Sequence, residues 1–184
     1  MIDEMKAERA RVPKELLGHS EEKGVRFIRP IVTGDETWIH HYDPEYKKQF
    51  MVYCHKESSP APKKFKTKAS AGKVMLTVFW NPKCVLLTDF LEKGARVNLE
   101  LCIEDLKNVK KRFMRKKAEI YDILFEHDNA RPHTSAATTD AIVCLGFTVL
   151  PHPAYSLDLA PSDFHLFPKG KEALRRKTSS LIKK

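Results

Sequence analysis

The sequence lacks the features of a membrane-spanning or secreted protein. None of its apolar runs approaches the roughly 20 residues that a helix needs to cross a bilayer. The first eleven residues are rich in charge and contain no apolar segment of the kind found in secretory signals. We therefore expect a soluble intracellular protein and no membrane partner.

Cysteine is scarce. The four cysteines are widely separated and form no C-x-x-C pair; they are Cys54, Cys84, Cys102 and Cys144. Such spacing argues against a zinc site, and nothing in it indicates an oxidising compartment. We expect reduced thiols that serve mostly in packing.

An acidic excess is also missing. The chain carries 33 Lys and Arg against 24 Asp and Glu, a net charge of +9. This balance favours a polyanionic partner, either nucleic acid or an anionic membrane surface, and does not choose between them. The 184 residues, 42% of them hydrophobic, suffice for one domain with a buried core.

The first half of the chain predicts strands around a long insertion. Residues 1–24 are polar and are typical of a linker or lead-in helix. Residues 25–33 are rich in β-branched types and predict a strand that ends at Gly34 and Asp35, with a second extended piece over residues 38–42. Residues 43–72 form an irregular insertion. Its basic cluster consists of Lys63, Lys64, Lys66 and Lys68.

The second half alternates strands with helices. Residues 74–80 predict a buried central strand, followed by a turn at 81–83 and a returning strand over 84–91. Apolar residues at helical spacing follow Asn98, and residues 120–126, 134–145 and 147–150 predict strand, helix and strand. Gly146 suits a helix C-cap, and Pro161 suits the first turn of a last helix. The pattern indicates an α/β fold, a mixed sheet flanked by helices.

Three aspartates stand at predicted element boundaries. Asp35 ends the first strand, Asp128 ends the strand before the second helix, and Asp163 opens the last helix. Adjacent strands would bring the first two together, and the helix could add the third. Three hard oxygen ligands suit Mg²⁺, and two such ions can serve phosphodiester chemistry. Aspartate is also common at strand ends and in first helical turns for structural reasons.

The sequences around these aspartates carry a family resemblance. Residues 32–38, 127–134 and 155–167 resemble the three catalytic blocks of mariner DNA transposases, with 34 residues between Asp128 and Asp163 as in that family. Residues 12–16 resemble the linker motif that precedes the family's catalytic domain. The resemblance runs from about Arg11 to Arg176 and extends to the transposase part of SET–mariner fusion proteins. Three long blocks in order are a specific signal.

The resemblance implies a ribonuclease-H-like domain over residues 25–184, shortened at its C-terminal end. It implies Asp35, Asp128 and Asp163 as catalytic metal ligands for two Mg²⁺ or Mn²⁺ ions, with water as the first nucleophile. The substrate would be transposon-end DNA, joined to a TA target in the nucleus. A homodimer through the linker and the insertion loop is also implied. Asp158, five positions nearer to Asp128, is a rival third ligand.

Several neighbouring residues admit two interpretations. His127 and His133 fit orientation of Asp128 better than metal binding, because the expected ions prefer oxygen. Asn129 and Arg131 suit either a phosphate contact or the fixing of a turn. The lysine cluster of the insertion suits either DNA or a solvated loop. Trp38 is expected in the core rather than in a stacking platform.

The chain also departs from the family pattern. Arg11 replaces the tryptophan of the linker motif, and Leu157 replaces the proline of the third block. The helix-turn-helix modules that recognise transposon ends are absent from these residues, so we expect weakened end recognition. The hypotheses are an active strand-cleaving and strand-joining enzyme, a catalytically impaired DNA-binding remnant or host-adopted fragment, and a relic that folds poorly.

Overall fold

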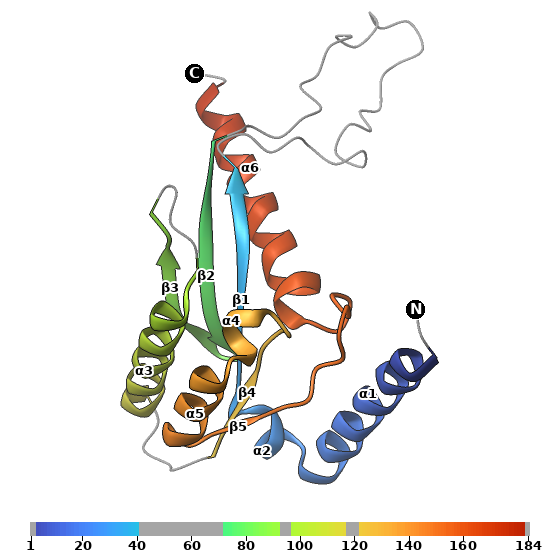
Figure 1. The fold of residues 1–184 in the computed structure, drawn as a ribbon. Coiled ribbons are helices and arrows are strands. Elements are labelled where there is room, and N and C mark those ends of the chain that lie inside the picture. Colours follow the sequence, from blue (N-terminus) through green and yellow to red (C-terminus); the bar gives the residue numbers. More distant parts are fainter. Residues whose placement is uncertain (1–2, 41–71, 93–96, 117–121, 183–184) are drawn as a thin grey trace, which may run out of the picture.

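The computed structural model describes residues 3–40, 72–92, 97–116 and 122–182, with only the backbone of residue 116 and of residues after 174 (Figure 1). The strands are β1 (Ile31–His40), β2 (Lys73–Asn81), β3 (Cys84–Phe90), β4 (Ile123–Glu126) and β5 (Phe147–Val149). The helical elements are α1 (Asp3–Lys23), α2 (Val25–Ile28), α3 (Leu99–Lys116), α4 (Arg131–Thr134), α5 (Ala136–Cys144), the π-helical segment η2 (Ser162–Leu166) and α6 (Phe167–Ile182).

The five strands form one mixed sheet in the order β3-β2-β1-β4-β5. β1 lies at its centre, antiparallel to β2 and parallel to β4. The pairs β2–β3 and β4–β5 are antiparallel and parallel, respectively. This confirms the predicted mixed sheet and the predicted hairpin, whose turn is fixed by the Asn81 side chain. Its Oδ1 accepts the backbone N–H groups of Lys83 and Cys84, each at 2.9 Å.

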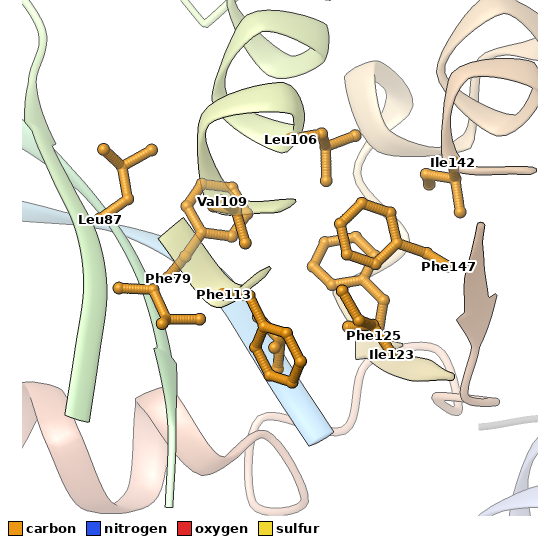
Figure 2. Packing of buried hydrophobic residues seen from close by; sticks show 11 residues of the cluster. Phe79, Leu87, Leu106, Val109, Phe113, Ile123, Phe125, Ile142 and Phe147 are labelled. Carbon is orange, nitrogen blue, oxygen red and sulfur yellow. The ribbon is translucent and has the colours of Figure 1, made fainter. Parts of the chain in front are cut away.

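Helices cover both faces of the sheet. α3 and α5 lie on one face and α6 runs along the other (Figure 1). The core lies under α3 and α5, where side chains from that face of the sheet meet the apolar side of α3 (Figure 2). The buried residues of α3 recur every three to four positions, as its sequence predicts; they are Cys102, Leu106, Val109 and Phe113. The opposite face of the sheet contacts η2.

Local capping explains where the later helices begin and end. Asn98 Oδ1 accepts the N–H of Leu101 at 2.9 Å and starts α3. Gly146 adopts a positive φ of 70° after α5, which confirms its expected C-cap role. The predicted helix over residues 134–145 is observed as α5, which begins at Ala136 because Ser135 Oγ accepts the N–H of Thr138 and caps it.

Two strand predictions in the first half are wrong. The predicted strand over residues 25–33 begins with the short helix α2, because Gly24 takes a positive φ and its carbonyl accepts the N–H of Phe27 at 3.1 Å. The strand does not end at Gly34 and Asp35 either. β1 continues to His40, with Asp35 paired to Val78 of β2. The two predicted extended pieces are therefore one strand.

Other predictions concern ends, thiols and membranes. Residues 1–24, predicted as a linker or lead-in helix, contain α1, with Pro13 inside it. Residues 43–71 of the predicted insertion lie outside the described residues, as does Cys54. Among the described residues, Cys84, Cys102 and Cys144 form no disulfide with one another. Within the described ranges, every helix is too short or too polar to cross a bilayer.

Gly34 is required by the packing of the core. A Cβ built at Gly34 would lie 2.4 Å from Cε1 of the buried Phe79 ring. We expect Gly34→Ala to lower the free energy of unfolding by about 1–3 kcal/mol through overpacking. In the matched control Gly18→Ala, the new Cβ in α1 meets no atom within 4 Å, so helix propensity should stabilise the protein by about 0.5–1 kcal/mol. Urea melts of both variants measure the difference, and equal midpoints would contradict it.

Candidate active site

The central strand β1 sends alternate side chains to opposite faces of the sheet. Val32 and Gly34 face the core under α3, so Thr33 and Asp35 face the other side. Thr33 is paired with Glu126 of β4 in the parallel register. Asp35 and Asp128 each follow this pair by two residues, so the same register brings them to the same region of the sheet.

The third aspartate is delivered by η2. Asp163 lies in the first turn of this segment, immediately after Pro161 at its N-cap, as the sequence predicts. Trp80 of β2 attaches η2 to the sheet, because its Nε1–H donates to Ser162 Oγ at 3.0 Å. The Trp80 ring also stacks with His165, with centroids 6.2 Å apart. The segment that carries Asp163 is thus held on the same face as Asp35.

The three aspartates are electrostatically coupled. Burial, followed by the charge of Asp163, raises the pKa of Asp35 to about 7. The charges of Glu36 and Asp128 add to this, and the Glu36 N–H, which donates to Asp35 Oδ1 at 2.7 Å, opposes it. Burial and then the charge of Asp128 raise the pKa of Asp163. The fold therefore concentrates negative charge that it does not fully neutralise.

The donor set fits a hard divalent cation. All three side chains offer carboxylate oxygens, and Asp128 has 47% of its side chain exposed. Among the described residues, no three His, Cys, Asp or Glu side chains are already arranged around one metal position. Mg²⁺ commonly takes only one or two carboxylates and completes its shell with waters and substrate phosphates. Three aspartates that share such ions with a bound substrate would therefore supply enough protein ligands.

The two histidines beside Asp128 contact it as predicted. His127 Nδ1–H donates to the Asp128 carbonyl at 2.6 Å. His133 Nε2 lies 3.7 Å from Asp128 Oδ1 and 3.3 Å from Glu36 Oε2. Burial opposes a charge on His133, but its contacts with Cys102 and Glu36 outweigh burial and raise its pKa. A protonated His133 therefore lies between the carboxylate of Asp128 and that of Glu36, the residue that follows Asp35 in β1.

The remaining predicted residues have different surroundings. Asn129 Nδ2 donates to the His152 carbonyl at 3.0 Å, which fixes the turn after β4. Arg131 is exposed at the start of α4. Trp38 is exposed with Lys73 Nζ 3.8 Å from its ring centroid, so the core prediction for it is wrong. Lys63, Lys64, Lys66 and Lys68 lie outside the described residues.

Asp158, the rival third ligand, is engaged elsewhere. Both of its carboxylate oxygens accept from Arg9 Nη2 of α1, at 2.9 and 3.1 Å. Arg9 Nη1 also donates to the Tyr155 carbonyl at 3.1 Å and to Ser156 Oγ at 2.9 Å. We call these contacts the Arg9 clamp. They tie the lead-in helix to the loop that precedes Asp163.

Sequence reasoning missed a second group on the site face. Glu126 is buried, and its carboxylate accepts from Thr33 Oγ1 and contacts His152 Nδ1 at 3.1 Å. The alternation of β4 was an available signal, because Glu126 stands two residues before Asp128 and therefore faces the same side. No local pattern pointed to His152, which is brought near by the pairing of β5 with β4.

The raised pKa of Asp35 predicts a pH-dependent stability. A carboxyl whose folded pKa exceeds its unfolded value of 3.8 stabilises the fold below pH 3.8, and that contribution is lost as pH rises through about 7. In the absence of divalent ions, Asp35→Asn should melt above the parent by a larger margin at pH 8 than at pH 5, because the contribution is lost progressively between pH 3.8 and about 7. Thermal melts in EDTA test this, and a difference that is the same at both pH values would refute it.

The Arg9 clamp predicts unequal effects of two neighbouring arginines. Arg9 holds a loop far along the chain, whereas the partners of Arg11 among the described residues are Glu8 and Glu15 of its own helix. Arg9→Ala should cost about 1.5–3 kcal/mol, since charge-assisted hydrogen bonds are lost. Arg11→Ala should cost clearly less, because it loses only exposed ion pairs within one helix. Hydrogen exchange of α1 amides, faster in Arg9→Ala alone, is the readout; similar exchange in both variants would argue against the clamp.

Comparison with known proteins identifies the family to which this chain is related. Residues 43–123 match the family model described as a transposase (partial DDE domain). The chain is 36% identical over 177 residues to the mariner Mos1 transposase of Drosophila mauritiana, covering 94% of this chain and 50% of the relative. It is 32% identical over 145 residues to the histone-lysine N-methyltransferase SETMAR of Homo sapiens, covering 77% of this chain and 20% of that protein.

Solved structures agree. The Mos1 mariner paired end complex with Mn superposes with a TM-score of 0.81 at 34% identity, covering 95% of this chain and 50% of that one. The Mos1 transposase catalytic domain with raltegravir and Mn gives a TM-score of 0.72 at 31% identity, covering 95% and 74%. The chain spans about half the length of the Mos1 transposase. Sequence blocks, ribonuclease-H-like sheet and carboxylate site together make this chain a member of the mariner transposase family, matching its catalytic domain.

Proposed function

We propose that this chain catalyses metal-dependent cleavage and joining of DNA strands. The observation that carries the proposal is the coupling of Asp35 with Asp163 and Asp128, because burial and the charges of these aspartates raise the pKa of Asp35 to about 7. A cluster of carboxylates at this cost to stability is typical of a functional site. Bound cations would relieve the repulsion.

The three aspartates would hold two Mg²⁺ or Mn²⁺ ions. Carboxylate oxygens suit both metals, and solved structures of the Mos1 transposase are titled as complexes with Mn and with Mg. When bound, a pair of such ions supplies Lewis acidity to the attacking and leaving oxygens of a phosphodiester. The protein's own task is to fix the carboxylates, which it does through β1, β4 and the Trp80–Ser162 hydrogen bond.

The substrate would be DNA bound mainly by its phosphates. The net charge of +9 favours such a partner, and exposed Arg131 stands at the same edge as Asp128. Mos1 structures are titled as complexes with a transposon end and as a strand transfer complex. By this relationship we propose transposon ends as the first substrate and a TA target as the second, with the insertion lysines as further phosphate contacts.

We also propose that the chain works as a homodimer in the nucleus. The family relationship and the basic charge support both statements. The linker contact of such a dimer would differ from the family pattern at Arg11, which is exposed and engaged with Glu8 and Glu15 on α1. Sedimentation velocity of the purified chain, with and without DNA, measures the assembly.

Nicking of supercoiled DNA tests the proposed activity. The purified chain should convert the plasmid to nicked form in Mg²⁺ or Mn²⁺ and fail to do so in EDTA. Asp128→Ala should reduce the rate by at least about 10³-fold, since the loss of a metal-binding group removes electrostatic stabilisation of the transition state.

The matched control is Asp140→Ala, an exposed aspartate of α5 remote from the site. It should nick at the parental rate. A folded parent that binds DNA in a filter assay but leaves the plasmid intact in both metals would overturn the enzyme proposal and leave a DNA-binding fold. Equal nicking by the parent and Asp128→Ala would indicate a contaminating nuclease.

A further inference from the structure

A second acid–histidine pair lies beside the three aspartates. Glu126 and His152 are in contact, with 3.1 Å between Oε1 and Nδ1, and each side chain is about nine-tenths buried (11% and 9% exposed). Oε2 of the same carboxylate accepts a hydrogen bond from Thr33. Both oxygens of Glu126 are thus used by the protein, which distinguishes this carboxylate from the three aspartates.

The backbone fixes His152 at the edge where the aspartates lie. β5 runs parallel to β4, with Val149 opposite Phe125, and the Leu150 N–H continues the pairing by donating to the Phe125 carbonyl at 2.8 Å. The His152 carbonyl then accepts from Asn129, the residue that follows Asp128. Ligands of open α/β sheets bind at the carboxyl ends of such parallel strands.

The imidazole of His152 is electrostatically coupled to the aspartates. The hydrogen bond with Glu126 raises the pKa of His152, burial opposes it, and the charges of Glu126, Asp128 and Asp35 add to the rise. In turn His152 lowers the pKa of Asp163, as Lys171 does. These couplings agree with the backbone contacts, which place His152 beside the end of β4 that leads to Asp128.

The contact with Glu126 determines how each of the two ring nitrogens of His152 can be used. Nδ1 faces Glu126 and donates its N–H to that carboxylate, which fixes the orientation of the ring. In the imidazolium form, which an ion pair with Glu126 stabilises, Nε2 carries a second N–H on the opposite side of the ring and is a donor of fixed direction. The phosphate group of the proposed substrate has two non-bridging oxygens. Metal ions held by the aspartates need not contact both of them.

We propose that His152, oriented by Glu126, is a substrate-contacting residue whose Nε2–H donates a hydrogen bond to one non-bridging oxygen of the scissile phosphate. The inference rests on the proposed function, since it assigns a role within that same site. No bond to His152 forms or breaks. The contact stabilises the charge that develops on the phosphate oxygens during displacement. Glu126 acts as a positioning residue through His152.

Stereospecific sulfur substitution tests this contact. The substrate is a labelled duplex that carries one site mapped in the nicking assay, with either non-bridging oxygen of that phosphate replaced by sulfur. For the parent, sulfur at a metal-contacted oxygen should slow cleavage in Mg²⁺ and be rescued by Mn²⁺, which accepts softer ligands. Sulfur at the oxygen that faces His152 should slow cleavage about tenfold in both metals, because sulfur is a weak acceptor.

The His152 variants then separate contact from structure. His152→Ala should slow cleavage of the all-oxygen duplex by about 10²-fold and should abolish the second sulfur effect while keeping the first. His152→Gln retains an amide donor and should recover part of the rate, and His19→Ala, an exposed histidine of α1, should behave as the parent. Thermal melts verify that His152→Gln is folded even where His152→Ala is not.

The outcomes are distinct. A folded His152→Gln or His152→Ala that cleaves more slowly yet keeps both sulfur effects at parental size would overturn the proposed contact and leave His152 a structural partner of Glu126. Glu126→Gln should weaken the second sulfur effect without removing Mn²⁺ rescue of the first. A parent that cleaves no DNA in either metal would instead defeat the proposed function, and this inference with it.

Discussion

The central position of β1 is the constraint on which the rest of the structure depends. Because β1 is hydrogen-bonded to a strand on each side, its orientation is fixed and its side chains point alternately to the two faces of the sheet. Gly34 and its neighbours must accommodate the aromatic core, including the Phe79 ring that occupies the space of a Cβ. Asp35 must then lie on the opposite face, within range of Asp163 and Asp128. Core packing and site geometry are consequences of the same alternation.

The site stores electrostatic repulsion that the surrounding contacts only partly offset. His133 lies between Asp128 and Glu36, while His152 and Lys171 counter the charge of Asp163. A fold that holds like charges together in this way is preorganised for a multivalent cation and for the phosphate that such a cation attracts. The Trp80–Ser162 hydrogen bond keeps the last carboxylate from moving away.

Local chemistry made much of the fold predictable from the sequence. The Asn81 turn, the amphipathic α3 and the Gly146 cap each depend on side chains close in the sequence. The three aspartates were marked by their long motifs. Prediction failed where a distant partner decided the outcome. Gly34 was expected to end a strand, yet it lies within β1 because it pairs with Phe79 of β2, whose ring packs where a side chain would be. His152 was not identified because only the β4–β5 pairing brings it to Glu126.

The Arg9 clamp has a consequence for how the chain is made. Arg9 and Asp158 are 149 positions apart, so a ribosome must synthesise most of the molecule before the clamp can close. During that time α1 can fold locally, as helices do quickly, but it has no docking loop. Docking of α1 therefore belongs to the late, high-contact-order part of folding. The loop that leads to Asp163 gains its anchor in that same step.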